Sequence, residues 1–183
     1  HLVLATLHTN SAPESVTRLL DMGMDPFNFA DALLGILAQR LVKRLCKCKE
    51  YYLASEHEIN SLLNEYCEEL NNIERFKAGP EAARQEIRDD WVKQYGNDNG
   101  EIMLCKPVGC DNCAGTGFSG RVGLHELMTA SDELKKNIQE HARVAEMLVT
   151  ALGDGMRTLK QDGIEKVLQG VTDIHQVRVV CIK

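Results

Sequence analysis

The sequence predicts an α/β protein in which helices dominate. An uninterrupted apolar run at residues 2–7 (LVLATL) is typical of a buried strand. Apolar stripes with helical spacing then recur along much of the 183-residue chain. Two closely spaced cysteine pairs, in LCKCKE and GCDNCAGTG, predict a small metal-binding knuckle between the helical parts.

Composition and charge narrow the class of protein. A hydrophobic content of 44% with 26% charged residues is ordinary for a globular protein, and no apolar run approaches the roughly 18 residues that span a bilayer. Seven irregularly spaced cysteines favour metal ligation and free thiols over a disulfide framework. We therefore expect a cytoplasmic protein without a membrane span. No basic stripe typical of nucleic-acid binders is present, so nucleic acid is not an expected partner.

The first 45 residues are expected to hold one strand and two helices. The strand at residues 2–7 is apolar on both faces and needs neighbours on either side, so we expect the chain to be the C-terminal part of something larger. Ser11 and Glu14 predict a capping box for a helix ending near Gly23. Asp25 and Pro26 begin a second helix. Three-and-four spacing predicts that this helix is long and continues to the first cysteine pair; its apolar positions are Ala30, Leu33, Leu34, Leu37, Leu41 and Leu45.

Residues 50–104 have the character of a separate acidic module. They hold 13 acidic and 5 basic residues, a local charge of −8. A capping box at Ser55 and Glu58 begins one predicted helix, and Gly79-Pro80 begins a second, so the segment is predicted to be a helical hairpin. Beyond it we expect a strand at 122–128 and helices at about 132–140, 143–152 and 156–168.

The cysteine pairs predict a structural zinc site. Cys110 and Cys113 are three apart and can direct both sulfurs at one ion, and the glycines around them permit a tight turn. Cys46 and Cys48 are the nearest pair to complete a tetrahedron of thiolates, for which zinc is the usual ion. The alternative is that these are free buried thiols.

Three stretches together resemble the hexameric ATPases that power type II secretion and type IV pilus assembly. HLVLATLHTN is similar to that family's histidine box, LAQRLVKRLCKCK and GCDNCAGTGFSGRVGLHEL to the two halves of its tetracysteine motif, and GMRTLKQDGIEKVLQGVTDIHQV to its C-terminal helices. The resemblance covers everything except residues 50–104. Related pilus-retraction ATPases lack the cysteine pattern, so the resemblance favours assembly or secretion.

The resemblance implies an organisation and a set of partners. Residues 1–45 would be the last part of a RecA-like P-loop ATPase core, 46–128 a tetracysteine zinc module carrying the acidic insert, and 129–183 a C-terminal helical subdomain. The parent protein would be a homo-hexamer that binds ATP and Mg²⁺ and contacts inner-membrane platform proteins. His8 would sense the terminal phosphate of the nucleotide, and His1 would be the earlier member of the histidine box.

The sequence departs from the family pattern at two places. The first cysteine pair is one residue shorter than the family's Cys-x-x-Cys, so Cys105 and Cys67 are alternatives to Cys48 as the fourth ligand. The chain contains no G-x-x-x-x-G-K-[ST] loop to cradle phosphates, so we expect no ATP hydrolysis by these 183 residues alone.

Two other functions compete with this interpretation. The chain could be a stand-alone zinc-binding module for protein interaction, in which case His8 would tolerate substitution. A redox protein using Cys110 and Cys113 is the second rival, but that chemistry favours a cysteine pair at a helix N-terminus after a strand, whereas here glycines surround it.

Overall fold

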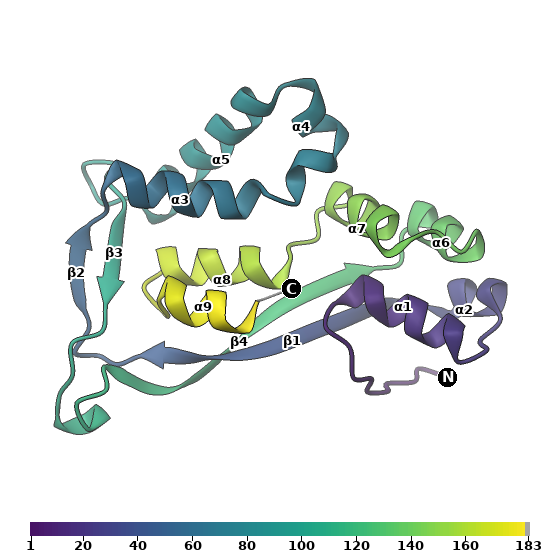
Figure 1. Cartoon of the computed structure of the whole chain (residues 1–183), viewed down its shortest axis with the longest axis horizontal. Helices are drawn as coiled ribbons and strands as arrows, with labels where there is room; N and C mark the ends of the chain where they lie inside the picture. The colour runs from purple at the N-terminus through teal and green to yellow at the C-terminus, as the bar shows by residue number, and fades with distance from the viewer. Residues whose placement is uncertain (182–183) are drawn as a thin grey trace. The chain divides into compact units, whose positions relative to one another are not determined.

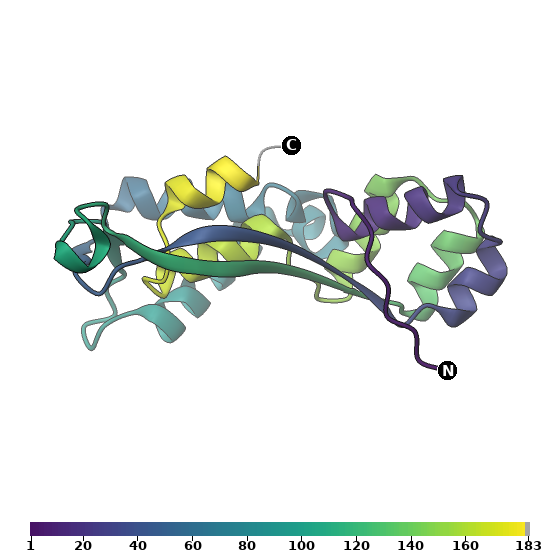
Figure 2. The same cartoon turned by 90° about the horizontal axis from the view of Figure 1, so that it is seen from below.

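A computed structural model describes residues 1–181 of the chain as a mixed α/β protein (Figures 1 and 2). The contacts divide the chain into two compact units. The first unit comprises residues 1–38 and 125–157, and the second comprises residues 39–124 together with residues from 158 onward. No helix within the described residues is both long and apolar enough to cross a membrane.

The first unit is built from four helices. They are α1 (Ala12–Asp21), α2 (Pro26–Ala32), α6 (Asp132–Gln139) and α7 (Val144–Gly153). Helix α1 packs on α7, and α6 packs on both α2 and α7. The core that these helices enclose also receives a residue from strand β4 (Phe118–Thr129); its buried members are Ala12, Val16, Phe29, Ala30, Met128, Leu134, Ile138, Met147, Ala151 and Met156.

Helix α1 begins where the sequence predicted it to begin. Ser11 is the N-cap, and its hydroxyl oxygen accepts the Glu14 N–H. The Glu14 carboxylate, however, accepts the N–H of Asn10 over 3.2 Å, one residue before the position that a complete capping box would use. The start of the helix is therefore fixed by the side chains of Ser11 and Glu14.

The predicted buried strand at residues 2–7 is wrong. Within the described residues, the two sheets pair β1 (Gly35–Leu45) with β4 and β2 (Glu50–Leu53) with β3 (Met103–Lys106), and residues 1–9 belong to neither. Leu2 is 75% exposed and Leu4 is 90% exposed. A strand needs the backbone groups of a neighbouring strand for its hydrogen bonds. No strand within residues 1–181 pairs with this segment, so its apolar side chains stay at the surface.

The predicted long helix ending at Leu45 is also wrong. Helix α2 ends at Ala32, and the chain continues as strand β1 from Gly35. The periodicity misled because leucines four residues apart share one face of a strand as well as one face of a helix. Leu37 and Leu41 lie on the exposed face at 58% and 48% exposure, whereas the alternate position Val42 is buried.

Strands β1 and β4 pair with each other, and both views show them side by side and running in opposite directions (Figures 1 and 2). Strand β4 extends the predicted strand at 122–128 toward the cysteine-bearing loop, starting at Phe118. At the other end of the pair, the Cys46 N–H donates to the Gly117 carbonyl oxygen over 2.9 Å. The two strands thus bring the two cysteine-bearing loops together.

The second unit combines the acidic insert with the last helices of the chain. The insert contains α3 (Glu56–Cys67), the short helix η1 (Leu70–Asn72), α4 (Glu74–Ala78) and α5 (Pro80–Tyr95), between β2 and β3. The predicted Ser55–Glu58 capping box and the helix that begins at Pro80 are both confirmed. The unit ends with α8 (Leu159–Leu168) and α9 (Ile174–Val180).

The insert and the last two helices share one hydrophobic core. Helix α3 packs on α8, and α8 packs on α9 and β3. The buried members of this core include Ile59, Leu62, Leu63, Tyr66, Cys67, Phe76, Ala83 and Trp91 from the insert and Leu159, Ile164, Val167, Leu168 and Val177 from α8 and α9. Apolar packing against α8 and α9 therefore supports the insert.

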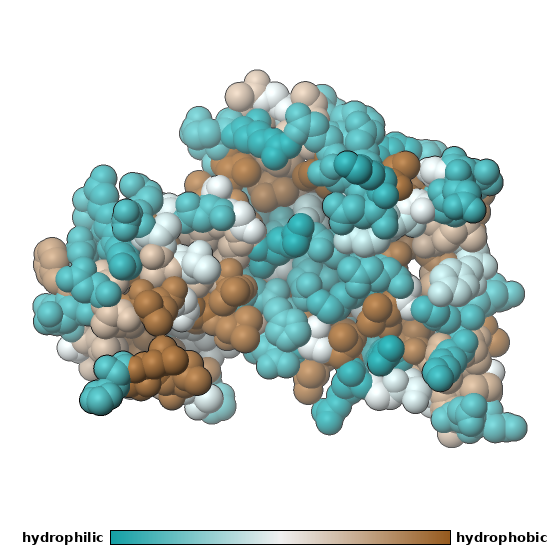
Figure 3. All heavy atoms as spheres, turned by 180° about the vertical axis from the view of Figure 1, so that it is seen from behind, coloured by the Kyte–Doolittle hydropathy of each residue, from teal (hydrophilic) through white to brown (hydrophobic). Residues whose placement is uncertain are grey.

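Apolar side chains also reach the surface, as the brown patches of Figure 3 show. In the first unit the exposed large apolar residues lie in the segment before α1, around α2, and on the outward positions of the strand pair. They are Leu2, Val3, Leu4, Leu7, Met22, Met24, Phe27, Leu34, Leu37 and Leu127. Exposed apolar surface of this extent is typical of faces that pack against other protein.

Candidate metal centre

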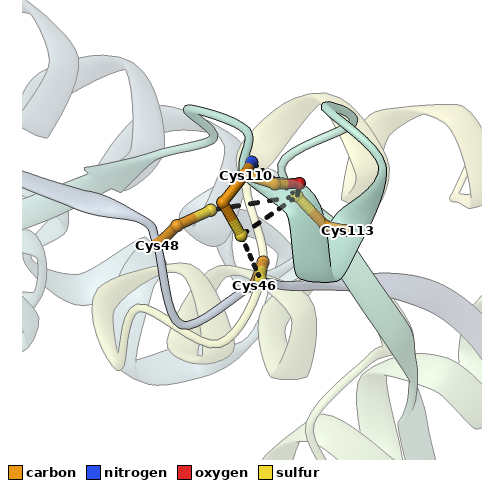
Figure 4. A group of neighbouring side chains, drawn as sticks. All are labelled: Cys46, Cys48, Cys110 and Cys113. Carbon is orange, nitrogen blue, oxygen red and sulfur yellow. Dashed lines mark hydrogen bonds between the residues drawn. The ribbon is translucent and has the colours of Figure 1, made fainter.

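Four cysteine side chains converge at one end of the β1–β4 pair (Figure 4). Cys46 directly follows β1, Cys48 lies in the turn before β2, and Cys110 and Cys113 lie in the loop that contains the short helix η2 (Asp111–Cys113). The four Sγ atoms all lie within 4.8 Å of one another. The separations are 3.8 Å for Cys46–Cys110, 3.9 Å for Cys48–Cys113 and 3.8 Å for Cys110–Cys113.

These separations fit a tetrahedral ion. Four sulfur atoms about 2.3 Å from one zinc ion at tetrahedral angles lie about 3.8 Å from one another. The four thiols are compatible with zinc binding on this ground, and the all-sulfur donor set favours zinc among common metals. Cys67 and Cys105 are not part of the group. Cys67 is fully buried in the core of the second unit, and Cys105 lies in β3.

The Cys110–Cys113 turn owes its geometry to backbone hydrogen bonds. The N–H groups of Cys113 and Gly115 both donate to the Cys110 carbonyl oxygen, at 3.1 and 3.0 Å. The chain turns through Ala114, whose φ of 50° is left-handed, and Gly115, whose φ is 75°. A side chain at Gly109, also left-handed, would meet the Gly115 carbonyl oxygen at 2.6 Å, so this glycine is required for the close approach.

Hydrogen bonds to sulfur prepare the group for ionisation. The pKa of Cys113 is lowered to about 6: burial opposes this, but the N–H groups of Cys110 and Gly117 and the neighbouring thiols stabilise its thiolate. The hydrogen bond from the Gly109 backbone lowers the pKa of Cys48, but burial and the neighbouring thiols together raise it to about 11. Cys113 thus forms a thiolate readily and Cys48 does not. A bound dication would favour the thiolate form of both.

Hydrogen bonds tie the residues beside the cysteine cluster to the segment between α8 and α9. The Leu45 N–H donates to the Val171 carbonyl oxygen over 2.9 Å, and the Thr172 hydroxyl donates to the Lys43 carbonyl oxygen over 2.8 Å. The Lys49 ammonium reaches the Gly170 carbonyl oxygen at 2.5 Å. The residues flanking Cys46 and Cys48 therefore hold the end of α8, a link that no sequence motif indicated.

The predicted nucleotide-sensing residues lie in the first unit. His8 is exposed and borders a shallow hollow of about 320 Å³. The other residues around this hollow are mostly polar: Thr9, Asn10, Glu14, Thr17, Arg18, Asp21 and Val144. His1 is exposed and does not line the hollow. The structure therefore places mostly polar residues around His8 and leaves His1 outside this hollow.

Glu126 is a residue that the sequence reasoning missed. Its carboxylate is buried in the first unit and accepts the N–H of Ala12, the first residue of α1, over 2.7 Å. The signal was present in GLHELM. Leu124, Glu126 and Met128 are two residues apart, so in a strand Glu126 faces inward together with the two apolar residues. A carboxylate at an inward strand position is unusual enough to single out.

Comparison with known proteins places the chain in a family. Residues 1–179 match the family model described as "Type II/IV secretion system protein". The chain belongs to this family. It is 38% identical over 180 residues to the type IV pilus assembly ATPase PilB of Thermus thermophilus and 36% identical over 178 residues to the type II secretion system protein E of Dickeya dadantii. It is 34% identical over 180 residues to the type II secretion system ATPase E of Vibrio cholerae.

These matches cover nearly all of the chain but a small part of each relative. Each alignment spans 97% of the chain. It spans 17% of the Thermus relative and 29% of the other two. The chain thus corresponds to under a third of each of these type II/IV secretion system proteins, and the resemblance found from the histidine box and the cysteine pairs is confirmed at the level of the family.

Proposed function

We propose that this chain is part of a cytoplasmic ATPase that powers type IV pilus assembly or type II protein secretion. The observation that carries the proposal is similarity along 97% of the chain to relatives named as ATPases of both systems. The motor would work as a homo-hexamer, and ATP with Mg²⁺ would bind to the complete protein. Because the 183 residues lack a phosphate-binding loop, they would hydrolyse no ATP alone.

We further propose that Cys46, Cys48, Cys110 and Cys113 hold a structural zinc ion. Support comes from the sulfur separations near 3.8 Å and from the N–H groups directed at Cys113 Sγ. Four thiolates leave no open coordination position, so the ion would supply cross-linking rather than catalysis. It would join the end of β1 to the loop before β4 and close the chain segment that carries the acidic insert.

His8 is proposed to sense the terminal phosphate of ATP in the complete motor. An imidazole can donate to a phosphate oxygen or hold an attacking water, and its protonation changes near neutral pH. The polar hollow that His8 borders with Asn10 and Arg18 suits such a role. His1, the earlier histidine, would contribute only in contact with parts of the motor outside these 183 residues.

Substitution of His8 by alanine in the complete motor is expected to lower ATP turnover about 100-fold, the scale of one lost transition-state contact. The measurement is steady-state ATPase activity of the complete protein, compared with the His57→Ala variant. His57 is an exposed histidine on α3 of the insert and serves as the matched control. Wild-type turnover in the His8→Ala protein would contradict the proposed role and favour the rival function as a zinc-binding interaction module.

The acidic insert is proposed to contact an inner-membrane platform protein. Its net charge of −8 sets it apart from the rest of the chain, and part of that charge is balanced by basic residues outside the insert, for example by Lys160 at Glu68. We expect the charge reversals Asp90→Lys and Asp98→Lys, both on exposed positions, to weaken platform binding at least tenfold at low salt. Unchanged binding by the double variant, measured by titration calorimetry, would remove the insert from the interface.

A further inference from the structure

A buried carboxylate lies near the C-terminal end of strand β4. Glu126 is 4% exposed, whereas the next residue on the strand, Leu127, is 55% exposed. Burying a carboxylate is costly unless it is held by hydrogen bonds or by favourable local charge. An apolar side chain would fill the same inward position at a lower desolvation cost. Packing alone therefore does not explain a glutamate at this position.

One hydrogen bond of Glu126 is to the first residue of helix α1. The Ala12 N–H donates to Glu126 Oε1 over 2.7 Å, across 114 positions of sequence. Ala12 is itself fully buried, so its N–H has no access to water. The first N–H groups of a helix lack partners within the helix, and the N-terminus carries partial positive charge. A carboxylate at this point both satisfies the donor and complements the charge.

The start of α1 in turn fixes the segment that follows His8. The Thr9 hydroxyl lies 2.6 Å from the Ser15 hydroxyl and donates to the Ser11 carbonyl oxygen over 3.3 Å. The Asn10 N–H donates to Glu14. Thr9 and Asn10 are therefore bound to the first turn of the helix, and the imidazole of His8 is attached directly to them.

We propose that Glu126 is a positioning residue for His8. Its hydrogen bond holds the first turn of α1 against β4. Because Thr9 and Asn10 are bound to that turn, Glu126 also determines the position of His8 beside the hollow. The inference rests on the proposed role of His8, but the contacts that carry it belong to the chain itself. It also links the strand that leaves the cysteine loop to the segment proposed to sense nucleotide, within the first unit.

Amide exchange tests the structural half of the proposal in the complete protein. In Glu126→Ala, peptides covering residues 9–16 are expected to exchange at least tenfold faster, whereas peptides from α6 and α7 keep their wild-type rates. Glu126→Gln keeps an oxygen acceptor and is expected to exchange near the wild-type rate. If the alanine variant does not fold, Glu126→Asp takes its place. The shorter side chain keeps the charge but moves the carboxylate away from the Ala12 N–H, so an intermediate exchange rate is expected. Glu133→Ala, which removes an exposed carboxylate from α6, is the control.

ATP turnover tests whether Glu126 acts through His8. We expect Glu126→Ala to lower kcat at least tenfold in the otherwise wild-type protein. In a protein that already carries His8→Ala, the same substitution should lower kcat by less than a further twofold. Additive losses, unchanged exchange at residues 9–16, or acceleration spread equally over α6 and α7 would each overturn the proposal. If His8→Ala turns over ATP at the wild-type rate, the proposed function fails at His8. The exchange rates then decide on their own whether Glu126 holds the segment.

Discussion

Replacing Cys113 with serine is expected to reduce bound zinc from about one ion per chain to almost none. Its Sγ lies 3.8 Å from that of Cys110 and 3.9 Å from that of Cys48, and a serine hydroxyl is a poor replacement for a thiolate. With free zinc about 1,000-fold above its dissociation constant, the bound ion contributes about 4 kcal/mol to stability. The variant should lose that contribution in chemical unfolding.

The control for this experiment is Cys67→Ser. Cys67 is fully buried in the core of the second unit, so the polar hydroxyl should lower the free energy of unfolding without changing the zinc content. Cys105→Ser should also keep its zinc. Retention of one zinc ion by Cys113→Ser, or its loss from either control, would show that the ligand set is wrong.

Loss of zinc should also weaken the attachment of the segment that follows helix α8. The residues beside Cys46 and Cys48 hold Gly170, Val171 and Thr172 through the hydrogen bonds described above. The ion would thus stabilise the docking of the last helices as well as the two cysteine loops.

Replacing Trp91 with alanine is expected to destabilise the second unit by about 3–5 kcal/mol. Trp91 is 3% exposed, and its ring meets that of Tyr66 edge-on with centroids 5.3 Å apart. Tyr66 in turn reaches α8: its hydroxyl donates to Glu165 over 2.8 Å, and its carbonyl oxygen accepts the side-chain amide of Gln161 over 2.9 Å. A cavity at Trp91 should therefore loosen α8 together with the insert.

Amide exchange and denaturant unfolding check this expectation. Lys93→Ala on the exposed side of the same helix is the control and should change stability by less than about 0.5 kcal/mol. Faster exchange in α3 and α5 alone, with α8 unchanged, would contradict the shared core and make the insert an independent module.

The sequence predicted elements whose signals are local. The caps at Ser11 and Ser55, the proline at position 80 and the glycines around Cys110 act within a few residues, so they could be interpreted without knowing the rest of the chain. The spacing of Cys110 and Cys113 is a local signal of the same kind. The shorter Cys46–Cys48 pair left Cys105 and Cys67 as alternatives, and the meeting of the two pairs depends on the pairing of β1 with β4.

The errors arose where the outcome depends on distant partners. The run at residues 2–7 has the composition of a strand but lies beside no strand among the described residues. The spacing of the leucines from 34 to 45 does not by itself distinguish a helix from a strand. The segment forms a strand because it pairs with β4, more than seventy residues away. The buried Glu126 and the docking of α8 beside Lys49 likewise depend on long-range contacts. The domain boundaries at 45 and 128 stay a prediction.

The most direct test of the zinc centre is X-ray absorption at the zinc edge of protein purified without added chelator. Binding by Cys46, Cys48, Cys110 and Cys113 predicts four sulfur neighbours at about 2.3 Å and about one zinc ion per chain. Nitrogen or oxygen neighbours in place of sulfur, fewer than four sulfurs, or protein that is fully folded without metal would contradict it.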